Sequence, residues 1–523
     1  MTTMRAAILA ALSFIMAFVM VPGRALAQDV TLRSHDGSVE ISGNLLGFDG
    51  EFYRVDTIYG ELTVDGSGVG CEGPGCPDLE HYVARLVFSG APTIGRVLMP
   101  ALIEAFAIRG DYDVTREDLS AQEVRFALHQ GATGVLIGEF LFRMTNTDEG
   151  FADLLTDEAD IAMTLREARQ DEITRAREAG LGNLTAQGQV RVLALDALIP
   201  VVAPSNPVQG ISLRQLARVL SGEITNWADL GGPDAPIDVH LWDAATGIGQ
   251  ASVDQVLRPE GRHVLDRAMR HADGAAFAEV VSRDPFALGL TTRSEQGNTW
   301  ELALTGDCGF ALNATRRAVK TEDYPLTAPL FIYLPARRLP KLGREFMTYL
   351  RDPSAQLVIR RAGFVDQTPE EIEINAQGDR FANAIAQAGA ELGLDELQRM
   401  VRVLGPLKRL TTTFRFEAGS VRLDAQSRSN AEQLARAMEL GHYDARRLVF
   451  VGFSDGDGPA GTNRDIALRR AETVRRAVVR AAETANLERI KLELEAFGEA
   501  MPMACDDTAW GRQVNRRVEV WVR

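Results

Sequence analysis

Hydrophobic and polar positions change their spacing along the chain, and each change predicts a different kind of structure. Residues 29–70 carry short alternating runs broken by Asp36-Gly37 and Asp49-Gly50, which is typical of β-hairpins. From about 83 to 365, strand-like and helix-like segments alternate, which favours an α/β architecture. Residues 375–405 show helical spacing and are expected to connect two domains.

Individual elements follow from the same pattern. In the α/β region we expect a strand at 85–88 and helices at 96–108 and 213–220, and an apolar run covers 196–203 and ends at Pro204. The C-terminal part, 410–523, is expected to hold two helices, near 426–440 and 464–482, and strands at 413–416, 448–453, 490–497 and 517–522. One apolar face of the second helix consists of Ala467, Ala471, Val474, Val478 and Ala481. Arg470 flanks this face, so its guanidinium can reach solvent or a ligand.

The N-terminus predicts the compartment. Arg5 precedes an apolar run from Ala6 to Val21, and the stretch ends in Ala25-Leu26-Ala27. This order is typical of a secretory signal peptide that is cleaved after Ala27. A membrane anchor is the alternative, but it requires a longer apolar run.

The four cysteines are therefore expected in an oxidising compartment. Cys71 and Cys76 flank Glu-Gly-Pro-Gly, a sequence that suits a tight turn and would bring the two sulfurs together. A half metal site is the alternative, but no partner pair with suitable spacing follows, so no metal is expected. The state of Cys308 and Cys505 stays open, and a bridge between them is a hypothesis that rests only on the compartment.

Composition narrows the class of partner. A chain of 523 residues is too long for one core, and 46% hydrophobic residues indicate globular domains. The formal charge of −16 argues against a nucleic-acid partner. It does not argue against a locally positive site for a small anion.

The C-terminal part contains a spaced set of polar residues. Gly452-Phe453-Ser454-Asp455 precedes a Gly/Pro loop, followed by Asn463, Arg469-Arg470-Ala471 and the closing Asn515-Arg516-Arg517-Val518-Glu519. This set resembles the OmpA-like peptidoglycan-associating domain over about 410–523. Phe453 stands where the family usually has His, and Ile466-Ala467 stand where it often has Leu-Ser.

The resemblance implies a βαβαβ domain that binds the diaminopimelate of the peptidoglycan stem peptide. Asp455 and Arg470 occupy the family's two ligand positions, while Asn463 and Arg516 occupy positions that shape the same pocket. The free end of diaminopimelate carries one ammonium and one carboxylate, which match a carboxylate and a guanidinium. A surface salt bridge is the simpler alternative, but it does not explain the whole pattern.

An enzyme is the rival interpretation. Gly452 to Gly456 match the G-x-S-x-G nucleophile elbow, which requires a helix immediately after the turn. A Gly/Asp/Pro loop follows here instead, and no His follows His442. We therefore expect no enzymatic activity and no cofactor.

The middle of the chain resembles the phosphate-binding component of ABC importers, of the periplasmic solute-binding fold. The resemblance covers about 83–365, in the family's order, and rests on Ala159–Met163, Ala194–Ala197, Pro204–Val208, Leu220–Trp227, Leu230–Gly232, Tyr324–Leu326 and Leu330–Tyr333. It implies two lobes with a ligand cleft between them. The candidate ligand loops are Gly90–Ile94, Thr164–Arg166 and Ala245–Ile248.

These loops depart from the family. Ala91 and Leu165 stand where a Ser is usual, and Ile248 interrupts the usual S-G-T of the third loop. Thr93, Arg166, Thr246 and Gly247 remain as the candidate anion-binding residues. For Thr93, Arg166 and Thr246, helix capping or a surface ion pair is the alternative role. Because each lost donor costs on the order of 1.5–3 kcal/mol, phosphate is expected to bind weakly.

Together these patterns predict an α/β and α+β multidomain protein. The expected boundaries are a signal peptide at 1–27, a small β module at 28–78, a two-lobed solute-binding domain at 79–368, a helical linker at 369–409 and an OmpA-like domain at 410–523. We expect a periplasmic protein, associated with the cell wall or outer membrane, that binds peptidoglycan and phosphate or another small anion, with an importer or other envelope proteins as further partners. The alternative is an envelope adaptor whose solute-binding fold no longer binds a solute.

Overall fold

The structure, a computed structural model, describes residues 29–523 except Glu80, Gln187, Asp307, Ala390, Ala418, Gly419 and Asp507. The predicted signal peptide lies outside the described residues. The chain divides into two units, residues 1–84 with 339–342 and residues 85–338 with 343–523, and each is described by itself.

The first unit is an antiparallel five-stranded sheet in the order β4-β3-β2-β1-β5. Its strands are β1 (Val30–Ser34), β2 (Glu40–Phe48), β3 (Phe52–Thr57), β4 (Gly60–Asp65) and β5 (Val69–Glu72). Alternation places Val30, Leu32, Tyr53 and Val55 in a small core. A disulfide joins Cys71 to Cys76, the pair predicted from the sequence, with an S–S distance of 2.01 Å.

The second unit begins with the first lobe of the α/β region. Its strands follow the order β19-β10-β6-β9-β8-β7, with β10 parallel to β6 and antiparallel to β19. The strands are β6 (Ala84–Gly90), β7 (Tyr112–Asp118), β8 (Glu123–Gln130), β9 (Leu136–Met144), β10 (Ile161–Thr164) and β19 (Thr327–Tyr333). The helices are α2 (Met99–Gly110), α3 (Thr147–Leu155), α4 (Gln170–Glu178), α9 (Lys341–Tyr349) and α10 (Pro353–Arg361).

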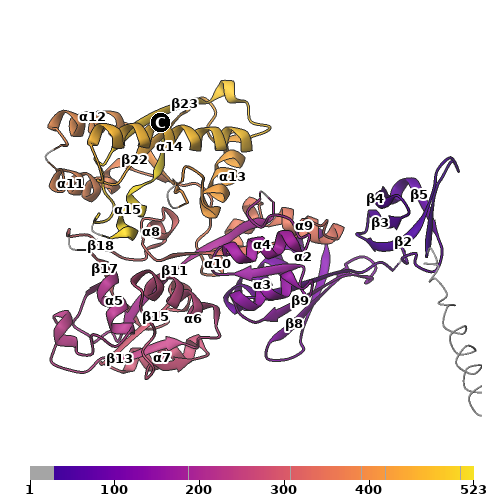
Figure 1. Ribbon diagram of the computed structural model, residues 1–523, viewed down its shortest axis with the longest axis horizontal. Coiled ribbons are helices and arrows are strands. Elements are labelled where there is room, and N and C mark those ends of the chain that lie inside the picture. Colours follow the sequence, from indigo (N-terminus) through magenta and orange to yellow (C-terminus); the bar gives the residue numbers. More distant parts are fainter. Residues whose placement is uncertain are drawn as a thin grey trace, which may run out of the picture. The chain divides into compact units, whose positions relative to one another are not determined.

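Strand β11 (Val190–Val202) connects this lobe to the second one. Its first half pairs with β19 and its second half with β15, so one sheet continues through both lobes. The second lobe contains β13 (Asp238–Trp242), β14 (Met269–His271), β15 (Ala287–Thr292), α5 (Leu213–Leu220), α6 (Gly247–Ser252) and α7 (Gly274–Arg283) (Figure 1). A small sheet of β12 (Gly210–Ser212), β17 (Ala303–Thr305) and β18 (Ala311–Leu312) adjoins α5.

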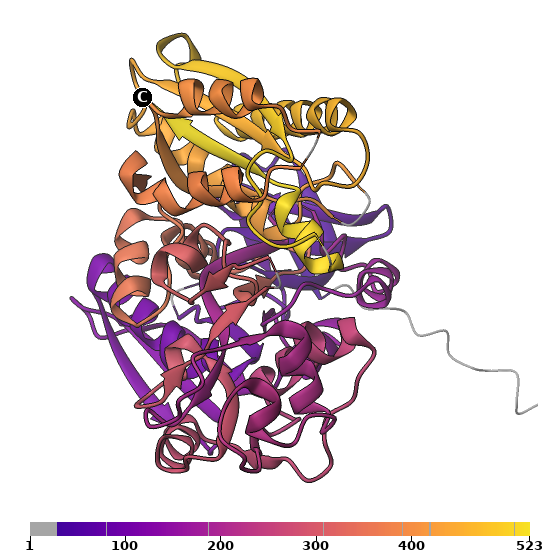
Figure 2. The ribbon, with the colours of Figure 1, turned by 90° about the vertical axis from the view of Figure 1, so that its left-hand side faces the viewer.

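The C-terminal region is a second sheet in the order β20-β21-β24-β22-β23. Its strands are β20 (Glu371–Ile372), β21 (Lys408–Phe414), β22 (Arg447–Phe453), β23 (Lys491–Gly498) and β24 (Val518–Val522), and its helices include α13 (Ala425–Glu439), α14 (Ala460–Ala481) and α15 (Ala509–Asn515). Helix α14 runs along β22 and β23 (Figures 1 and 2). The predicted α/β and α+β multidomain fold class is confirmed.

The segment predicted to be a linker packs against this sheet. It forms α11 (Gly378–Ala386) and α12 (Leu394–Leu404). Leu397, Met400 and Leu404 share a buried cluster with strand residues such as Val449 and Trp521. Helices α13 and α14 contribute to a different cluster, so the sheet has a core on each face. This packing ties α11 and α12 to the C-terminal sheet. The domain boundary placed between residues 409 and 410 stays a prediction.

Covalent and ionic contacts join the C-terminal sheet to the α/β region. A disulfide links Cys308, in the second lobe, to Cys505, with a Cα–Cα distance of 5.6 Å. Arg409 on β21, which is 1% exposed, donates to both carboxylate oxygens of Asp323 at 2.6 and 2.9 Å and lies 3.3 Å from Glu519. Such a buried charge is tolerated only when it is paired, so these contacts fix how the two parts meet.

Candidate functional site

The C-terminal candidate site is built where β22 ends. Residues Leu448 to Phe453 are buried, and the chain then leaves the sheet at Ser454 and Asp455 before α14 begins at Ala460. Helix α14 approaches the strand so closely that a Cβ on Gly452 would lie 2.0 Å from the carbonyl oxygen of Ala467. Only glycine fits there, and this contact holds the next turn of the helix, with Arg470, near the loop.

Asp455 and Arg470 lie in one electrostatic site together with Arg516. Nη1 of Arg516 donates to Oδ2 of Asp455 at 3.1 Å, and Asp455 is only 8% exposed. The guanidinium of Arg470 lies over the Phe416 ring, 5.5 Å from its centroid. Its Nε and Nη1 are buried and have no hydrogen-bond partner in the described structure. We call Asp455, Arg470 and Arg516 the clamp.

The pKa shifts of the clamp have a simple cause. Burial raises the pKa of the Asp455 carboxyl above its usual range, and the Arg516 cation offsets this only in part. Burial also lowers the pKa of the Arg470 guanidinium, and the neighbouring Arg516 lowers it further. Both groups would therefore be stabilised by a ligand that brings a cation to Asp455 and an anion to Arg470.

Asn463 holds the loop of the clamp in place. Its Nδ2 donates to the carbonyl oxygen of Gly458 at 3.1 Å and to Oε2 of Glu499 at 2.9 Å. It is buried, so these bonds fix the loop against α14. The sequence predicted that Asn463 shapes the pocket, and this contact pattern is compatible with that prediction.

Three further residues contribute to the clamp loop, and two of them, Asp506 and Glu499, were missed from the sequence. The hydroxyl of Ser454 is buried without a partner in the described structure. Asp506 accepts a hydrogen bond from the backbone of Gly456 at 2.8 Å, and Glu499 binds Asn463. Glu499 and Asp506 lie in a stretch without helical or strand periodicity, so no pattern indicates a role for them. Ser454 was assigned from the sequence only as the nucleophile of the rival enzyme interpretation.

The departure from the family at Phe453 has a structural explanation. Phe453 is fully buried, and the Arg517 guanidinium lies 4.3 Å from its ring centroid. The ring thus belongs to the core beneath the loop. Ser454, the nucleophile of the rival enzyme interpretation, bonds to no histidine among the described residues, and α14 does not follow it immediately.

The three candidate loops of the α/β region also meet. A Cβ on Gly247 would lie 3.1 Å from Cδ1 of Leu165 and 3.2 Å from Cβ of Ala91. Ala91, Leu165 and Ile248 are buried, so apolar groups occupy the place where the loops converge. The structure thus brings together the three loops that the sequence proposed as ligand loops, with the substituted positions Ala91 and Leu165 next to Gly247. That these loops bind an anion stays a prediction.

Thr246, one of the polar candidates, already has hydrogen-bond partners. Oγ1 of Thr246 caps α6 by accepting from the backbone of Gly249 at 3.0 Å, and it donates to the carbonyl of Asp243 at 2.7 Å. Thr93 is buried at the start of the π-helix Thr93–Leu98. The Gly247 backbone lies at the first turn of α6. A role for these groups in binding an anion remains a prediction.

Arg166 is held by carboxylates. It donates from both terminal nitrogens to Glu172 at 2.7 and 2.8 Å, and one of them also contacts Asp148. Burial lowers the pKa of its guanidinium, but the hydrogen bonds to Glu172 and Asp148 outweigh burial and raise the pKa overall. Its Nε lies 3.8 Å from Asp254 of the second lobe. An incoming anion would have to replace one of these carboxylates.

The cleft is electrically balanced. Arg169 lies 3.2 Å from both Asp148 and Asp254, and Arg258 lies 2.9 Å from Asp254. Three arginines thus face three carboxylates. The arginines are Arg166, Arg169 and Arg258, and the carboxylates are Asp148, Glu172 and Asp254. Ion pairs to Asp254 join the first lobe to the second, so the lobes are closed against each other.

Two family models match the chain. Residues 119–353 match the PBP superfamily domain, and residues 415–516 match the OmpA family. The chain therefore contains a periplasmic-binding-protein-like domain followed by an OmpA domain.

Two curated relatives match the first of these regions. The chain is 25% identical over 180 residues to a phosphate-binding protein PstS of Borreliella burgdorferi, which covers 33% of this chain and 64% of the relative. It is 26% identical over 234 residues to the protein SphX of Synechococcus elongatus, which covers 42% of this chain and 67% of the relative. The match thus spans about two thirds of the length of these relatives.

Solved structures resemble each region only distantly. An ABC-type phosphate transport receptor from Vibrio cholerae is 21% identical and covers 54% of this chain and 99% of its own, with a TM-score of 0.41. A peptidoglycan-associated lipoprotein from Burkholderia pseudomallei is 20% identical and covers 21% of this chain and 90% of its own, with a TM-score of 0.19.

The described residues hold neither a candidate metal centre nor a candidate membrane span. No group of three or more His, Cys, Asp or Glu in this part of the chain could hold a metal ion. None of its helices is both long and apolar enough to cross a membrane.

Proposed function

We propose that this protein is a cell-envelope binding protein that attaches non-covalently to peptidoglycan through its C-terminal domain. The clamp carries the proposal. Arg470 presents buried, unpaired guanidinium nitrogens close to Asp455, whose carboxylate is already desolvated. The free end of diaminopimelate supplies the two complementary charges on one carbon, so it would satisfy both groups at once.

The location follows from the same proposal. Attachment to peptidoglycan through an OmpA domain, the predicted signal peptide and two disulfides are mutually consistent with the periplasm. The protein would then be held at the wall or beneath the outer membrane. No enzymatic step is part of this function.

The test is co-sedimentation of the purified protein with peptidoglycan that contains diaminopimelate. Arg470→Ala and Asp455→Ala should each weaken binding by about 2–5 kcal/mol, which is roughly 30-fold to several thousand-fold. Arg469→Ala, one position earlier on the exposed side of α14, is the matched control and should bind normally. If both clamp variants sediment like the parent, the clamp is not the binding site.

We further propose that the α/β domain binds a small anion, such as phosphate, weakly. The names of its relatives support the ligand class, and the retained Thr93, Arg166, Thr246 and Gly247 supply the donors. The apolar centre of the cleft and the carboxylates on Arg166 both oppose tight binding. We expect a dissociation constant for phosphate on the order of micromolar or weaker.

One observation favours a second function, an adaptor without a solute. The three arginines of the cleft are fully matched by carboxylates, which leaves no net charge for an anion. Titration calorimetry of the purified protein with phosphate separates the two. Heat that disappears in Arg166→Ala supports anion binding, whereas no heat with phosphate, sulfate or a carboxylate supports the adaptor.

A further inference from the structure

A large cavity lies where the α/β domain and the C-terminal domain meet, away from both candidate sites. Its volume is 710 Å³. One wall is the start of β11, from Val190 to Leu193, together with Leu350 and Arg351. The other walls are the loop before α13, α13 itself and the stretch of α14 from Thr473 to Ala481. A cavity of this size holds a small organic ligand.

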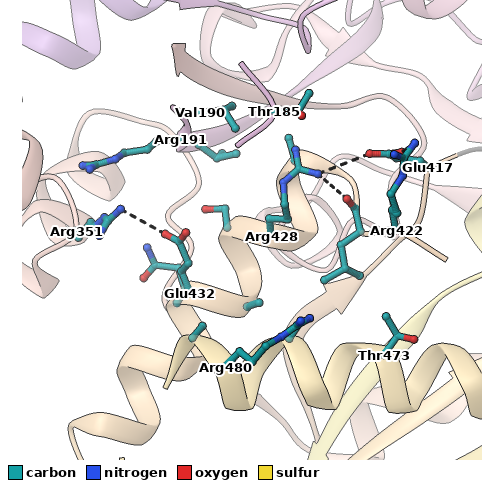
Figure 3. A pocket seen from close by; sticks show the side chains of 18 of the residues that line it. Thr185, Val190, Arg191, Arg351, Glu417, Arg422, Arg428, Glu432, Thr473 and Arg480 are labelled. Atoms are coloured by element: carbon teal, nitrogen blue, oxygen red, sulfur yellow. Dashed lines mark hydrogen bonds and ion pairs between the residues drawn. The ribbon is translucent and has the colours of Figure 1, made fainter. Parts of the chain in front are cut away.

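The lining is strongly basic although the whole chain carries a charge of −16. Two carboxylates, Glu417 and Glu432, face six arginines: Arg191, Arg351, Arg422, Arg428, Arg476 and Arg480. These residues come from both domains and surround a common space: Arg191 and Arg351 lie on one side, Arg422 and Arg428 on the other and Arg480 on α14 (Figure 3).

The two carboxylates neutralise only part of this charge. Glu417 lies 2.7 Å from Arg422 and 3.7 Å from Arg428. Glu432 lies 3.6 Å from Arg351. In the part of the chain that the structure describes, the other three arginines have no carboxylate within salt-bridge distance; they are Arg191, Arg476 and Arg480.

Arg191 is the most constrained of these three. Its Nη1 donates to the carbonyl oxygen of Met347 at 2.6 Å, while its Nε is buried and has no partner among the described residues. Burial, and then the neighbouring Arg351, lower the pKa of its guanidinium to about 10. The group therefore stays charged at neutral pH beside another cation, a situation that an anion in the cavity would relieve.

The remaining walls suit the uncharged body of a ligand. Leu193, Leu350, Leu423 and Ala477 contribute apolar surface, and the hydroxyls of Thr185 and Thr473 reach the lining. Guanidinium groups bind phosphate and carboxylate through two parallel hydrogen bonds, which favours ligands with several such groups.

We infer that this cavity is a binding site for a small organic polyanion that carries two or more phosphate or carboxylate groups. The site is composite, because Arg191 and Arg351 come from the α/β domain and Arg428, Arg476 and Arg480 from the C-terminal domain. It is separate from the cleft, whose charges balance, and from the clamp, which lies at the end of β22. A polyanion bound there would contact both domains at once and stabilise their contact.

The test is titration calorimetry of the full protein at physiological ionic strength with pyrophosphate and citrate as probes. These two arms distinguish phosphate from carboxylate chemistry, and acetate and glucose serve as singly charged and neutral controls. We expect at least one polyanion to bind ten-fold or more tightly than acetate. The double variant Arg476→Gln/Arg480→Gln should weaken that binding ten-fold or more.

Two controls keep the result specific. Arg469→Gln/Arg475→Gln removes the same charge from α14 outside the cavity lining and should leave binding unchanged. Arg166→Ala alters the cleft, so polyanion binding that disappears in this variant would belong to the cleft and not to the cavity. The inference is overturned if neither probe binds, if the two double variants weaken binding equally, or if Arg166→Ala abolishes it.

Discussion

Replacing both Cys308 and Cys505 with serine should destabilise the contact between the two domains far more than any single surface change. The disulfide closes a segment of 197 residues. In the chain-entropy model, a loop of this length restricts the unfolded chain enough to stabilise the folded state by about 5 kcal/mol. The estimate is robust, because the model depends on the logarithm of loop length. If only the C-terminal domain unfolds, roughly 140 residues remain in the loop and the figure still stays near 5 kcal/mol.

Urea unfolding followed by tryptophan fluorescence measures the effect, since Trp521 is fully buried on β24 of the C-terminal sheet. With a slope of about 2 kcal/mol per molar urea, the midpoint of that transition should fall by roughly 2.5 M. Cys71→Ser/Cys76→Ser is the matched control. That bridge closes a separation of 5 residues in the other unit, so the transition reported by Trp521 should not move. A shift below about 0.5 M in the Cys308→Ser/Cys505→Ser variant would refute the entropic argument.

Three further outcomes follow from the structure. Arg409→Gln leaves Asp323 buried without an ion-pair partner among the described residues, whereas Glu519 keeps Arg380 and Arg517. The substitution should lower the free energy of unfolding by about 3–5 kcal/mol, measured by urea denaturation; an unchanged midpoint would contradict the pairing. Gly452→Ala should lower the free energy of unfolding by about 1–3 kcal/mol, because the new methyl group meets the Ala467 carbonyl, and it should also weaken peptidoglycan binding. Gly461→Ala on α14 is the control and should bind normally, because no heavy atom lies within 4 Å of the added Cβ. Peptidoglycan binding should weaken as the pH falls, because the Asp455 carboxylate must be ionised to bind an ammonium. Since the pKa of this carboxyl is raised, co-sedimentation should decline at a pH above the value of about 4 expected for an ordinary aspartate. A decline only below that value would argue against this role.

The sequence predicts local structure well where a pattern is complete within a few turns. Helix α5 begins at Leu213 and ends at Leu220, as expected, because its apolar spacing is regular and Ser212 and Gln215 form a capping box. Asp455 and Arg470 of the clamp are also close in sequence, since they lie on one loop and the helix that follows it, whereas Arg516 comes 61 residues after Asp455. The family resemblance includes both segments, which explains why all three residues could be named in advance.

Polar residues in buried strands were harder to place. Strand β21 begins at Lys408, earlier than the predicted 413, because its buried Arg409 is satisfied by Asp323 from a distant part of the chain. No periodicity reveals such a tertiary partner. The helix predicted at 96–108 begins as an α-helix only at Met99, after a π-helical turn that the apolar spacing does not predict.

The partners of Arg166 could not be predicted for the same reason. They lie 18 residues before it, 6 residues after it and in the other lobe, at Asp148, Glu172 and Asp254. The polyanion cavity likewise arises only from the packing of two domains. The sequence shows that the chain has many arginines, but which of them pair with carboxylates depends on the fold.

The C-terminal domain is attached to both lobes of the α/β domain. On the second lobe it is held by the bond from Cys505 to Cys308, and on the first by contacts such as that of Ser429 with Gln367 at 2.8 Å. The lobes cannot swing apart about β11 without breaking the weaker of these attachments. If the proposed functions hold, the C-terminal domain would brace the two lobes, and the rate at which a solute enters or leaves the cleft would depend on how readily these attachments release. Any tension that the cell wall exerts on the clamp would reach the hinge by this route.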